Sequence, residues 1–436
     1  MKNNKSTTSH ITVYIFIVLI CFNTTIAGQN KTIADKKYQK EIQKLTKKGS
    51  IKTAFKILED IDVQTVKNLI TLTEIPAPPF KENQRALAFK SMLEKAGIDK
   101  SWIDEVGNVI ALRKGTKGDK VVVLDAHLDT VFPEDTDVIV RKKGDTLFAP
   151  GIGDDTRGLT MVIAVLNALN KANIQTESDL LFVGTVGEEG LGDLRGVRHL
   201  FKNNSLKIDS WISIDGGSLG RINNAALGSQ RYKAIFKGKG GHSWGAFGLA
   251  NPHHALGKAI SEFTTRAKEF VKTGPKTSYN VGRIGGGTSV NTIPFESWME
   301  VDMRSESVSQ LKRIDEIFTS SMQKAVTDYN NSGVNDKVIL ELVNIGSRPS
   351  GETPIKSPLI QRAIAVSNFL NANTKTTRGS TNANIPISLG IPAVTIGRGG
   401  KGGGAHSLGE WWLNENGVAA IKKALLLTIV EAKLTE

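Results

Sequence analysis

The stretch Val121–Pro133, "VVVLDAHLDTVFP", begins as an apolar strand and ends in a histidine and a carboxylate two residues apart. Side chains at positions i and i+2 of an extended chain lie on the same face, so His127 and Asp129 can point into one space. An imidazole that binds a metal usually donates its second ring N–H to a carboxylate or carbonyl. The stretch alone is equally compatible with a plain His–Asp hydrogen bond, and the rest of the chain has to distinguish the two.

Strand-like and helix-like segments alternate through the first half of the chain. Apolar runs at 107–112, 179–190 and 210–218 have the composition of buried strands, whereas 157–172 repeats apolar residues with a helical period. This alternation predicts a three-layer α/β fold, in which helices cover both faces of a sheet. Polar residues follow the strand ends, which is where ligands bind in folds of this class.

The pattern changes after Ala226. Residues 231–243 alternate like an exposed strand, and the segments that follow read as helix, two strands, helix and strand. That order predicts a small two-layer α+β sandwich with an antiparallel sheet, inserted at 227–344. The α/β pattern returns near the C-terminus, so the predicted α/β domain has two parts, 28–226 and 345–436.

The first 27 residues have the organisation of a cleavable signal peptide. Lys2 and Lys5 precede an apolar run, Ile11–Phe22, that is shorter than the roughly 18 residues needed to span a bilayer. Thr25–Ala27 then offers small residues for cleavage after Ala27, which predicts a secreted or periplasmic protein with no stable membrane span after processing. An uncleaved anchor is the alternative. The only cysteine, Cys21, lies in the apolar run, so the mature chain has no disulfide.

The composition is that of a soluble globular protein with an excess of positive charge. Of its 436 residues 39% are hydrophobic and 23% charged, and the formal net charge is +13. Much of the excess lies in 36–48, which a basic exposed helix explains most simply. Binding to nucleic acid is the alternative, but the sequence has neither an aromatic-interleaved basic motif nor zinc-finger spacing. We therefore expect no nucleic-acid partner.

Six acidic and imidazole groups recur near predicted strand ends. They are His127, Asp154, Glu188, Glu189, Asp215 and His406. Any one of them could be an ordinary solvated residue. Two divalent ions about 3.5–4 Å apart, however, need a bridging carboxylate and further N or O ligands on each side. Five of the six groups can supply that set and the sixth can act as a general base, so together they favour a two-metal hydrolase.

The motifs that carry these groups resemble those of the M20 family of metallopeptidases. The matching motifs are "HLDTV" (127–131), "APGIGDD" (149–155), "GEEG" (187–190), "IDGG" (214–217) and "GGAHSLGEWW" (403–412). "KGKGGHSWG" (237–245), "GGTSVNTIP" (286–294) and "DMRS" (302–305) resemble the family's inserted lid, or dimerisation, domain. The resemblance covers nearly all of the predicted mature chain in order. It implies that the α/β domain is catalytic and that the protein is a homodimer through the lid.

The resemblance also implies a role for each member of the constellation. The implied metal ligands are His127 and Asp215 on one ion, Glu189 and His406 on the other, and Asp154 between the two. Asp129 is implied to orient His127. Glu188 is implied to take a proton from the water between the metals and to pass it to the leaving amine. The expected cofactors are two Zn²⁺ ions per subunit, with Co²⁺ or Mn²⁺ as alternatives.

Three residues of the inserted domain are implied to contact the substrate. His242 is expected to stabilise the tetrahedral oxyanion from the neighbouring subunit. Asn291 and Arg304 are expected to bind a backbone carbonyl or the terminal carboxylate, for which a guanidinium is well shaped. Arg304 could instead pair with a neighbouring acid such as Asp302, and His242 could be a plain surface residue. The resemblance further implies a cis peptide bond after Asp154.

The chain departs from the family pattern in places that bear on its substrate. Thr156 follows the acidic pair where many relatives have Lys, and Asn382 stands where relatives often have Asp. Asp215, rather than Glu, resembles the peptidase T-like and dipeptidase branches and favours a peptidase that acts on short peptides with a free α-amine. A carboxypeptidase or N-acyl amino acid amidohydrolase of the same family is the near alternative. A non-catalytic binding protein on a peptidase fold is the distant one.

Overall fold

The computed structural model describes residues 32–202 and 206–435. The predicted signal peptide and its cleavage site lie outside these ranges. Within them, no helix combines the length and the apolar character that a membrane crossing requires.

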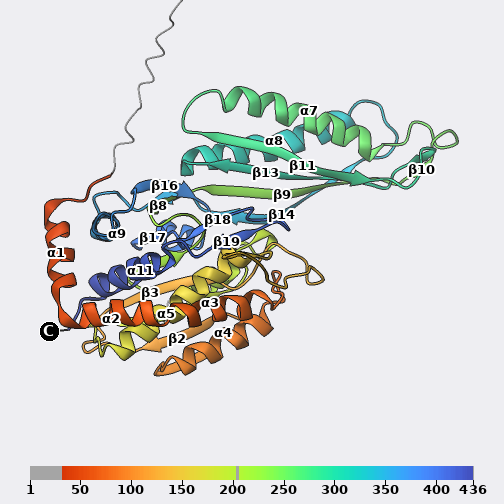
Figure 1. Cartoon of the computed structure of the whole chain (residues 1–436). Helices are drawn as coiled ribbons and strands as arrows, with labels where there is room; N and C mark the ends of the chain where they lie inside the picture. Colours follow the sequence, from red (N-terminus) through yellow and green to blue (C-terminus); the bar gives the residue numbers. More distant parts are fainter. Residues whose placement is uncertain (1–31, 203–205, 436) are drawn as a thin grey trace, which may run out of the picture. The chain divides into compact units, whose positions relative to one another are not determined.

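A nine-stranded mixed sheet forms the centre of the larger domain (Figure 1). Its order is β1 (Lys100–Ile103), β2 (Val109–Arg113), β6 (Asp179–Thr185), β3 (Val121–His127), β7 (Ser210–Ile214), β17 (Ala393–Ile396), β8 (Arg221–Ala226) and β15 (Gly351–Glu352), with β16 (Lys375–Gly379) also paired to β8. The four neighbours β6, β3, β7 and β17 are parallel. Their carboxyl ends therefore meet at one edge of the sheet, where side chains from distant segments can converge.

Helices cover both faces of this sheet, as the alternating pattern predicts. One face packs against α2 (Gly49–Asp60), α4 (Asn83–Lys95), α5 (Arg157–Lys171), α9 (Pro358–Phe369) and α11 (Gly417–Ala432), and the other against α6 (Arg195–Lys202) and α10 (Asn384–Ser388). Strand β3 shows why both faces are apolar: Val122 and Leu124 enter the first core, while Val123 enters the second. The predicted three-layer α/β architecture is confirmed.

The basic segment near the start of the described chain is helical, as the sequence predicts. It forms α1 (Lys36–Lys47), which is followed by α2 and α3 (Asp62–Thr73). Tyr38, Ile42 and Leu45 are buried in the first core. The spacing of these three residues gives the helix one apolar face, and most of its lysines lie on the exposed faces.

The inserted domain is a four-stranded antiparallel sheet covered on one face by two helices (Figure 1). The strands are β11 (Thr277–Gly286), β13 (Glu296–Ser305), β9 (Gly228–Lys237) and β14 (Ile339–Arg348) in spatial order, and the helices are α7 (Pro252–Phe270) and α8 (Val308–Asn330). Met299, Val301 and Met303 of β13 pack beneath the helices. Alternate residues of β13 are only partly buried and lie on the other face. The predicted boundary at 344 falls within β14.

Two small sheets complete the structure. One joins β18 (Lys401–Gly403), β19 (Trp411–Leu413), β5 (Thr146–Phe148) and β4 (Arg141–Lys143), and the other pairs β10 (Gly241–His242) with β12 (Thr292–Ile293). The Gly-rich segment before His406 reads as a loop in the sequence, but it contains β18. Pairing with β19 turns this segment into a hairpin, which holds His406 in its connection.

Candidate metal centre

The predicted ligands converge at the carboxyl edge of the central sheet. His127 is the last residue of β3, the Glu188–Glu189 pair follows β6, and Asp215 follows β7. Asp154 lies in the irregular turn Ile152–Thr156 that precedes α5. His406 arrives from the β18–β19 connection. Parallel strand order therefore brings together groups that are up to 279 positions apart in the sequence.

Asp154 lies between two imidazoles. Its Oδ1 is 3.2 Å from Nε2 of His127, and its Oδ2 is 3.2 Å from Nε2 of His406. The same His406 nitrogen is 2.9 Å from Oε1 of Glu189. One ligand atom each from His127, Asp154 and Glu189 lie within 4.8 Å of one another. A carboxylate that faces a separate nitrogen donor with each of its oxygens has the arrangement of a bridging ligand.

The electrostatics of this cluster suit a bound cation. Hydrogen bonds with Asp154 and Glu189 raise the pKa of His406 to about 10. Burial alone favours the neutral form of Asp154, but contacts with His127 and His406 hold its pKa below the usual value. The raised pKa of His406 shows that the carboxylates around it stabilise a positive charge. The lowered pKa of Asp154 shows that positive charge beside it stabilises the ionised carboxylate. Nitrogen and carboxylate donors are also ligands that Zn²⁺ accepts, so the residues fit divalent metal ions.

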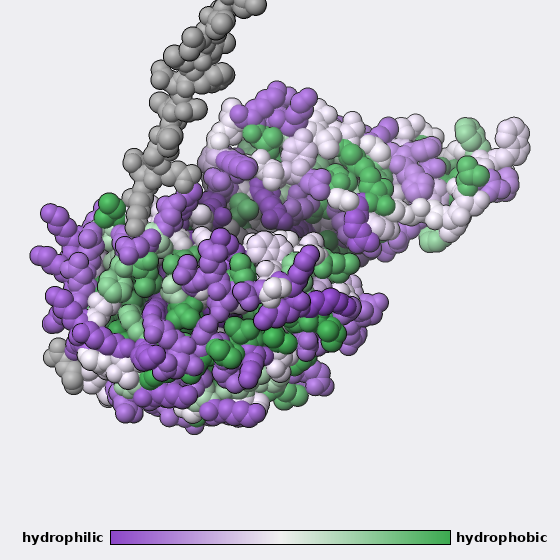
Figure 2. Space-filling model, in the orientation of Figure 1, coloured by the Kyte–Doolittle hydropathy of each residue, from purple (hydrophilic) through white to green (hydrophobic). Residues whose placement is uncertain are grey.

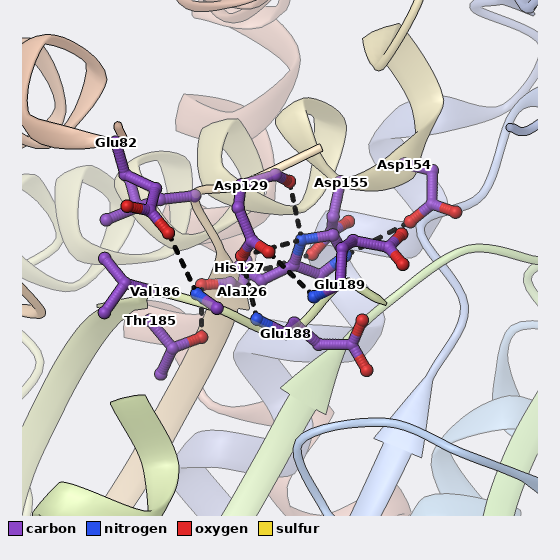
Figure 3. A network of polar contacts seen from close by, with 12 residues as sticks. Glu82, Ala126, His127, Asp129, Asp154, Asp155, Thr185, Val186, Glu188 and Glu189 are labelled. Carbon is purple, nitrogen blue, oxygen red and sulfur yellow. Dashed lines mark hydrogen bonds and ion pairs between the residues drawn. The ribbon is translucent and has the colours of Figure 1, made fainter. Parts of the chain in front are cut away.

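Asp129 supports the cluster mainly through the Glu188–Glu189 turn. Its carboxylate accepts hydrogen bonds from the backbone N–H groups of Glu188, at 2.9 Å, and Glu189, at 2.7 Å (Figure 3). The sequence predicts that Asp129 orients His127. In the structure its main-chain carbonyl lies 2.9 Å from Nδ1 of His127, whereas its carboxylate is 3.7 Å away. Asp129 therefore contacts the imidazole with its backbone and fixes the glutamate turn with its side chain.

The two glutamates leave this turn in different directions. Gly187, with φ of +66°, supplies a left-handed backbone just before them, which glycine adopts without strain. Glu189 points toward Asp154, while the carboxylate of Glu188 lies apart from that pair (Figure 3). Glu188 instead forms a buried ion pair with Arg348, at 3.0 Å. Burial raises the pKa of Glu188 well above its usual value, and Arg348 opposes that shift.

Two carboxylates that sequence reasoning did not single out shape the backbone around the predicted ligands. Glu410 is fully buried and accepts hydrogen bonds from the N–H groups of Gly151, Gly153 and Asp154, at 2.7 to 2.9 Å. Glu82 accepts the N–H of Gly187 at 3.2 Å. Glu410 lies in the "GGAHSLGEWW" motif, whose match was the one signal available for it. The peptide bond after Asp154 is cis, as the resemblance implies.

The model of peptidase family M20/M25/M40 matches residues 123–429. The chain belongs to this family. It is therefore a hydrolase of the peptidase class, as the sequence predicts. Bacillus subtilis YqjE, an uncharacterised protein, is 24% identical over 353 residues, which are 77% of this chain and 90% of that protein. The Escherichia coli cytosol non-specific dipeptidase is 25% identical over 320 residues, which are 62% of this chain and 61% of that enzyme.

Solved structures of M20-type proteins share the fold. Aminopeptidase PepT from Bacillus cereus superposes with a TM-score of 0.65 at 19% identity, covering 84% of this chain and 98% of that one. Bacillus subtilis YxeP, described as a dinuclear metal-binding peptidase of the M20 family, gives a TM-score of 0.61 at 18% identity, covering 85% of this chain and 99% of that one. The predicted M20 fold, with a catalytic domain and a lid, is confirmed.

A cavity of about 790 Å³ opens over the M20 cluster. Asp154, Glu188, Glu189, Asp215 and His406 line it, whereas His127 lies beneath them and is buried. Arg304 also lines the cavity, and it pairs with Asp302 at 2.7 Å, so the two interpretations of Arg304 are both compatible with its position. Arg348 is a lining residue that sequence reasoning missed, because nothing in "GSRPSG" distinguishes it from a turn residue.

His242 and Asn291 do not line this cavity. They lie together at the β10–β12 end of the inserted domain, where the N–H of Ser243 donates to the carbonyl of Asn291. Nδ1 of His242 accepts from the N–H groups of Trp244 and Gly245. Trp244 is 88% exposed, and hydrophobic side chains surface at this end of the domain (Figure 2). Within one subunit, these two predicted site residues are thus separate from the predicted ligands.

Asn382 lies beneath the M20 site and not at its substrate end. Its Nδ2 donates to Oδ2 of Asp125, at 2.6 Å, and to the hydroxyl of Thr185, at 2.7 Å. All three residues are buried. Burial raises the pKa of Asp125 to about 7, so an amide partner avoids placing a second carboxylate against it.

Proposed function

We propose that this M20 protein is an exported two-metal peptidase that hydrolyses short peptides with a free α-amine. The observation that carries the proposal is the position of Glu188, a buried carboxylate on the wall of the cavity, next in sequence to the ligand Glu189. His127, Asp154, Glu189, Asp215 and His406 are the residues that would hold two divalent ions, of which zinc suits the nitrogen and carboxylate donors best.

The bound metals would supply Lewis acidity, which lowers the pKa of water and polarises the scissile carbonyl. Glu188 would remove a proton from the attacking water and deliver it to the leaving amine. Burial supports the second step, since a carboxyl group with a raised pKa holds a proton more readily near neutral pH. Arg304 would bind the carboxylate at the end of the peptide.

We further propose that the active form is a homodimer through the inserted domain. His242 and Asn291 lie outside the cavity of their own subunit, so a role at the reacting carbonyl requires that they come from a partner. Trp244 and Phe247 are both exposed in the turn after His242, and neighbouring exposed apolar side chains of this size support an interface at this end, because contiguous apolar patches mark interaction sites. The proposal that the protein is exported rests on Lys2 and Lys5 and on the apolar run that follows them in the sequence.

The proposed activity is tested with purified protein and a set of blocked and free peptides. Dialanine and trialanine should be hydrolysed, their N-acetylated forms should react far more slowly, and a chelator should abolish the reaction until Zn²⁺, Co²⁺ or Mn²⁺ is restored. Faster hydrolysis of N-acetyl amino acids would favour the amidohydrolase alternative. Activity that survives complete metal removal would contradict the proposal.

A further inference from the structure

More cations than carboxylates line the cavity over the metal centre. The carboxylates are Asp154, Glu188, Glu189 and Asp215, and the cations are Arg221, Arg231, Arg304, Arg348, Arg398 and Lys401. Two divalent ions would more than neutralise the three proposed ligand carboxylates Asp154, Glu189 and Asp215, so the arginines and the lysine add positive charge to a site that is already compensated. Four of the six cations have carboxylate partners: Arg348 pairs with Glu188 and Lys401 with Glu415, at 3.0 and 2.7 Å, and Arg231 and Arg304 share Asp302.

Arg231 and Arg304 form a pair on the inserted domain. Both bind Asp302 through their Nε atoms, at 2.9 and 2.7 Å. Their terminal NH₂ groups donate no hydrogen bond to Asp302 in the described structure. Nη1 of Arg231 makes a long contact of 3.4 Å with the carbonyl of Gly190. One carboxylate thus orients two guanidinium groups. The pair can bind one further carboxylate, which in the proposed function is the terminus of the peptide.

Arg221 and Arg398 form a second set on the catalytic domain. Within the described ranges neither forms an ion pair at 4.0 Å or less, and each interacts with a carboxylate only at longer range, Arg221 with Asp215 and Arg398 with Glu410. The guanidinium of Arg221 donates to the main-chain carbonyl of Asp215, at 2.8 Å. Arg398 is buried, and its Nε has no hydrogen-bond acceptor in the described structure. Its charged neighbour Glu410 is already occupied by three backbone N–H groups.

Glycines keep the approach to this second set open. A Cβ at Gly402 would come within 2.7 Å of Nη2 of Arg398, and a Cβ at Gly379 within 3.3 Å of Nη2 of Arg221. A buried guanidinium without a partner is costly, and a bound anion removes that cost. If the terminal carboxylate of the peptide binds Arg231 and Arg304, it cannot also bind Arg221 and Arg398.

From these two sets of arginines we infer that the preferred substrates are short peptides with an aspartate or glutamate side chain as well as the terminal carboxylate. The terminus binds Arg231 and Arg304, and the acidic side chain binds Arg221 and Arg398. This inference rests on the proposed peptidase function and adds its substrate class. If Arg221 and Arg398 only balanced the buried acids beneath the site, an acidic side chain would give the peptide no advantage over the corresponding amide.

The inference is tested with isosteric peptide pairs. The purified metal-loaded enzyme is assayed for kcat/KM on Ala-Glu against Ala-Gln, and on Glu-Ala against Gln-Ala. We expect a preference of at least about tenfold for the acid in one pair, since hydrogen bonds to charged groups are worth that much or more. Equal rates within both pairs, or a preference for the amides, would overturn the inference while leaving the peptidase function intact.

Variants identify the residues responsible. Arg221→Gln and Arg398→Gln should each reduce the acid-to-amide ratio several-fold, with metal content measured in parallel. Arg313→Gln removes an exposed arginine of α8 that pairs with Glu316, and it should leave the ratio unchanged. A full ratio in both cavity variants would contradict the assignment.

A binding measurement separates the two proposals. Titration calorimetry with the metal-loaded Glu188→Gln variant measures the affinity of each peptide without turnover. The acid of the preferred pair should bind at least about tenfold more tightly than its amide, and added salt should weaken that preference. If no peptide is hydrolysed by the wild type, the peptidase function fails, and this measurement still decides the inference. Equal affinities would overturn it.

Discussion

The guanidinium of Arg348 lies 3.0 Å from the carboxylate of Glu188, and both side chains are buried. A second N–H of Arg348 also reaches the main-chain carbonyl of Glu188. Arg348 is the last residue of β14, the final strand of the inserted domain. The strand that closes the insertion thus ends on the proposed general base, and the placement of that base depends on the junction between the two domains.

Replacing Arg348 should lower turnover without emptying the metal site. Arg348→Ala leaves the Glu188 carboxylate buried and unpaired, and misplacement of a catalytic group by about 1 Å can cost about 10²-fold in rate. We expect kcat to fall by about that factor with metal content preserved, and Arg348→Lys to recover part of it. Arg362→Ala breaks ion pairs with Glu41 and Glu431 away from the cavity, so it should affect thermal stability but not kcat. A normal kcat in Arg348→Ala would contradict the positioning role.

Asp129→Asn should destabilise the protein even without metal. Each carboxylate oxygen of Asp129 accepts one N–H group, so an amide places an NH₂ donor against one of them, and a buried unsatisfied donor costs about 1–3 kcal/mol. Because both hydrogen bonds are independent of metal, urea unfolding of the chelator-treated protein should show the loss. Asp137→Asn, at an exposed carboxylate, is the control. A loss confined to the metal-loaded protein would indicate that Asp129 acts chiefly through His127.

His242 should act across the dimer. His242→Ala and Glu188→Gln should each be inactive alone, but mixed subunits can combine an intact Glu188 with an intact His242. Random exchange in a two-fold dimer gives about half hybrid molecules with one complete site each, so activity should recover to about a quarter of the wild-type value. Activity is measured after subunit exchange, which mass spectrometry verifies. Hybrid dimers without activity would count against the role in trans.

The buried Lys423 should make the free energy of unfolding depend on pH above pH 7. It is buried in α11, where its Nζ donates to the carbonyls of Leu219 and Arg221, and burial lowers its pKa to about 7. Between pH 7 and its ordinary pKa of 10.5 the unfolded chain binds the proton that the folded chain has lost, so the free energy of unfolding rises with pH. Each unit of pKa difference corresponds to about 1.4 kcal/mol.

Lys423→Met removes this dependence. Its stability relative to the wild type should be greatest near pH 7 and should decline toward pH 9, by at most about 1.4 kcal/mol per pH unit. Urea unfolding at pH 7, 8 and 9 measures the difference, with Lys44→Met on the exposed face of α1 as the control. A difference that stays constant over this range would show that Lys423 keeps its proton in the folded protein.

The sequence predicts much of the fold because its elements have local patterns. The alternation of Val122, Val123 and Leu124 between two cores, and the spacing of Tyr38, Ile42 and Leu45, are visible without coordinates. The strand β18 was missed because "KGG" has no apolar pattern. Its conformation depends on pairing with β19, whose other neighbour β5 lies more than 260 positions earlier in the chain.

The candidate site likewise has residues that the sequence predicts and contacts that it does not. His127, Asp154, Glu189, Asp215 and His406 could be named because each lies in a motif near a strand end. Their supporting contacts could not. Arg348 meets Glu188 across 160 positions, and Glu410 meets Asp154 across 256. Such contacts follow from the order of the strands, and the motifs around them carry no sign of the partner.

The central claim is that Glu188 transfers protons while Glu189 holds metal. It is tested most directly by measuring metal content and turnover together in Glu188→Gln, with Glu189→Gln as the matched variant. Glu188→Gln should keep two metals per subunit and lose at least about 10²-fold in turnover, the usual contribution of an acid–base group. Glu189→Gln should lose one metal and recover in part with excess Zn²⁺. Loss of metal from Glu188→Gln with both ions kept in Glu189→Gln would reverse the assignment, and full activity in both variants would contradict the account.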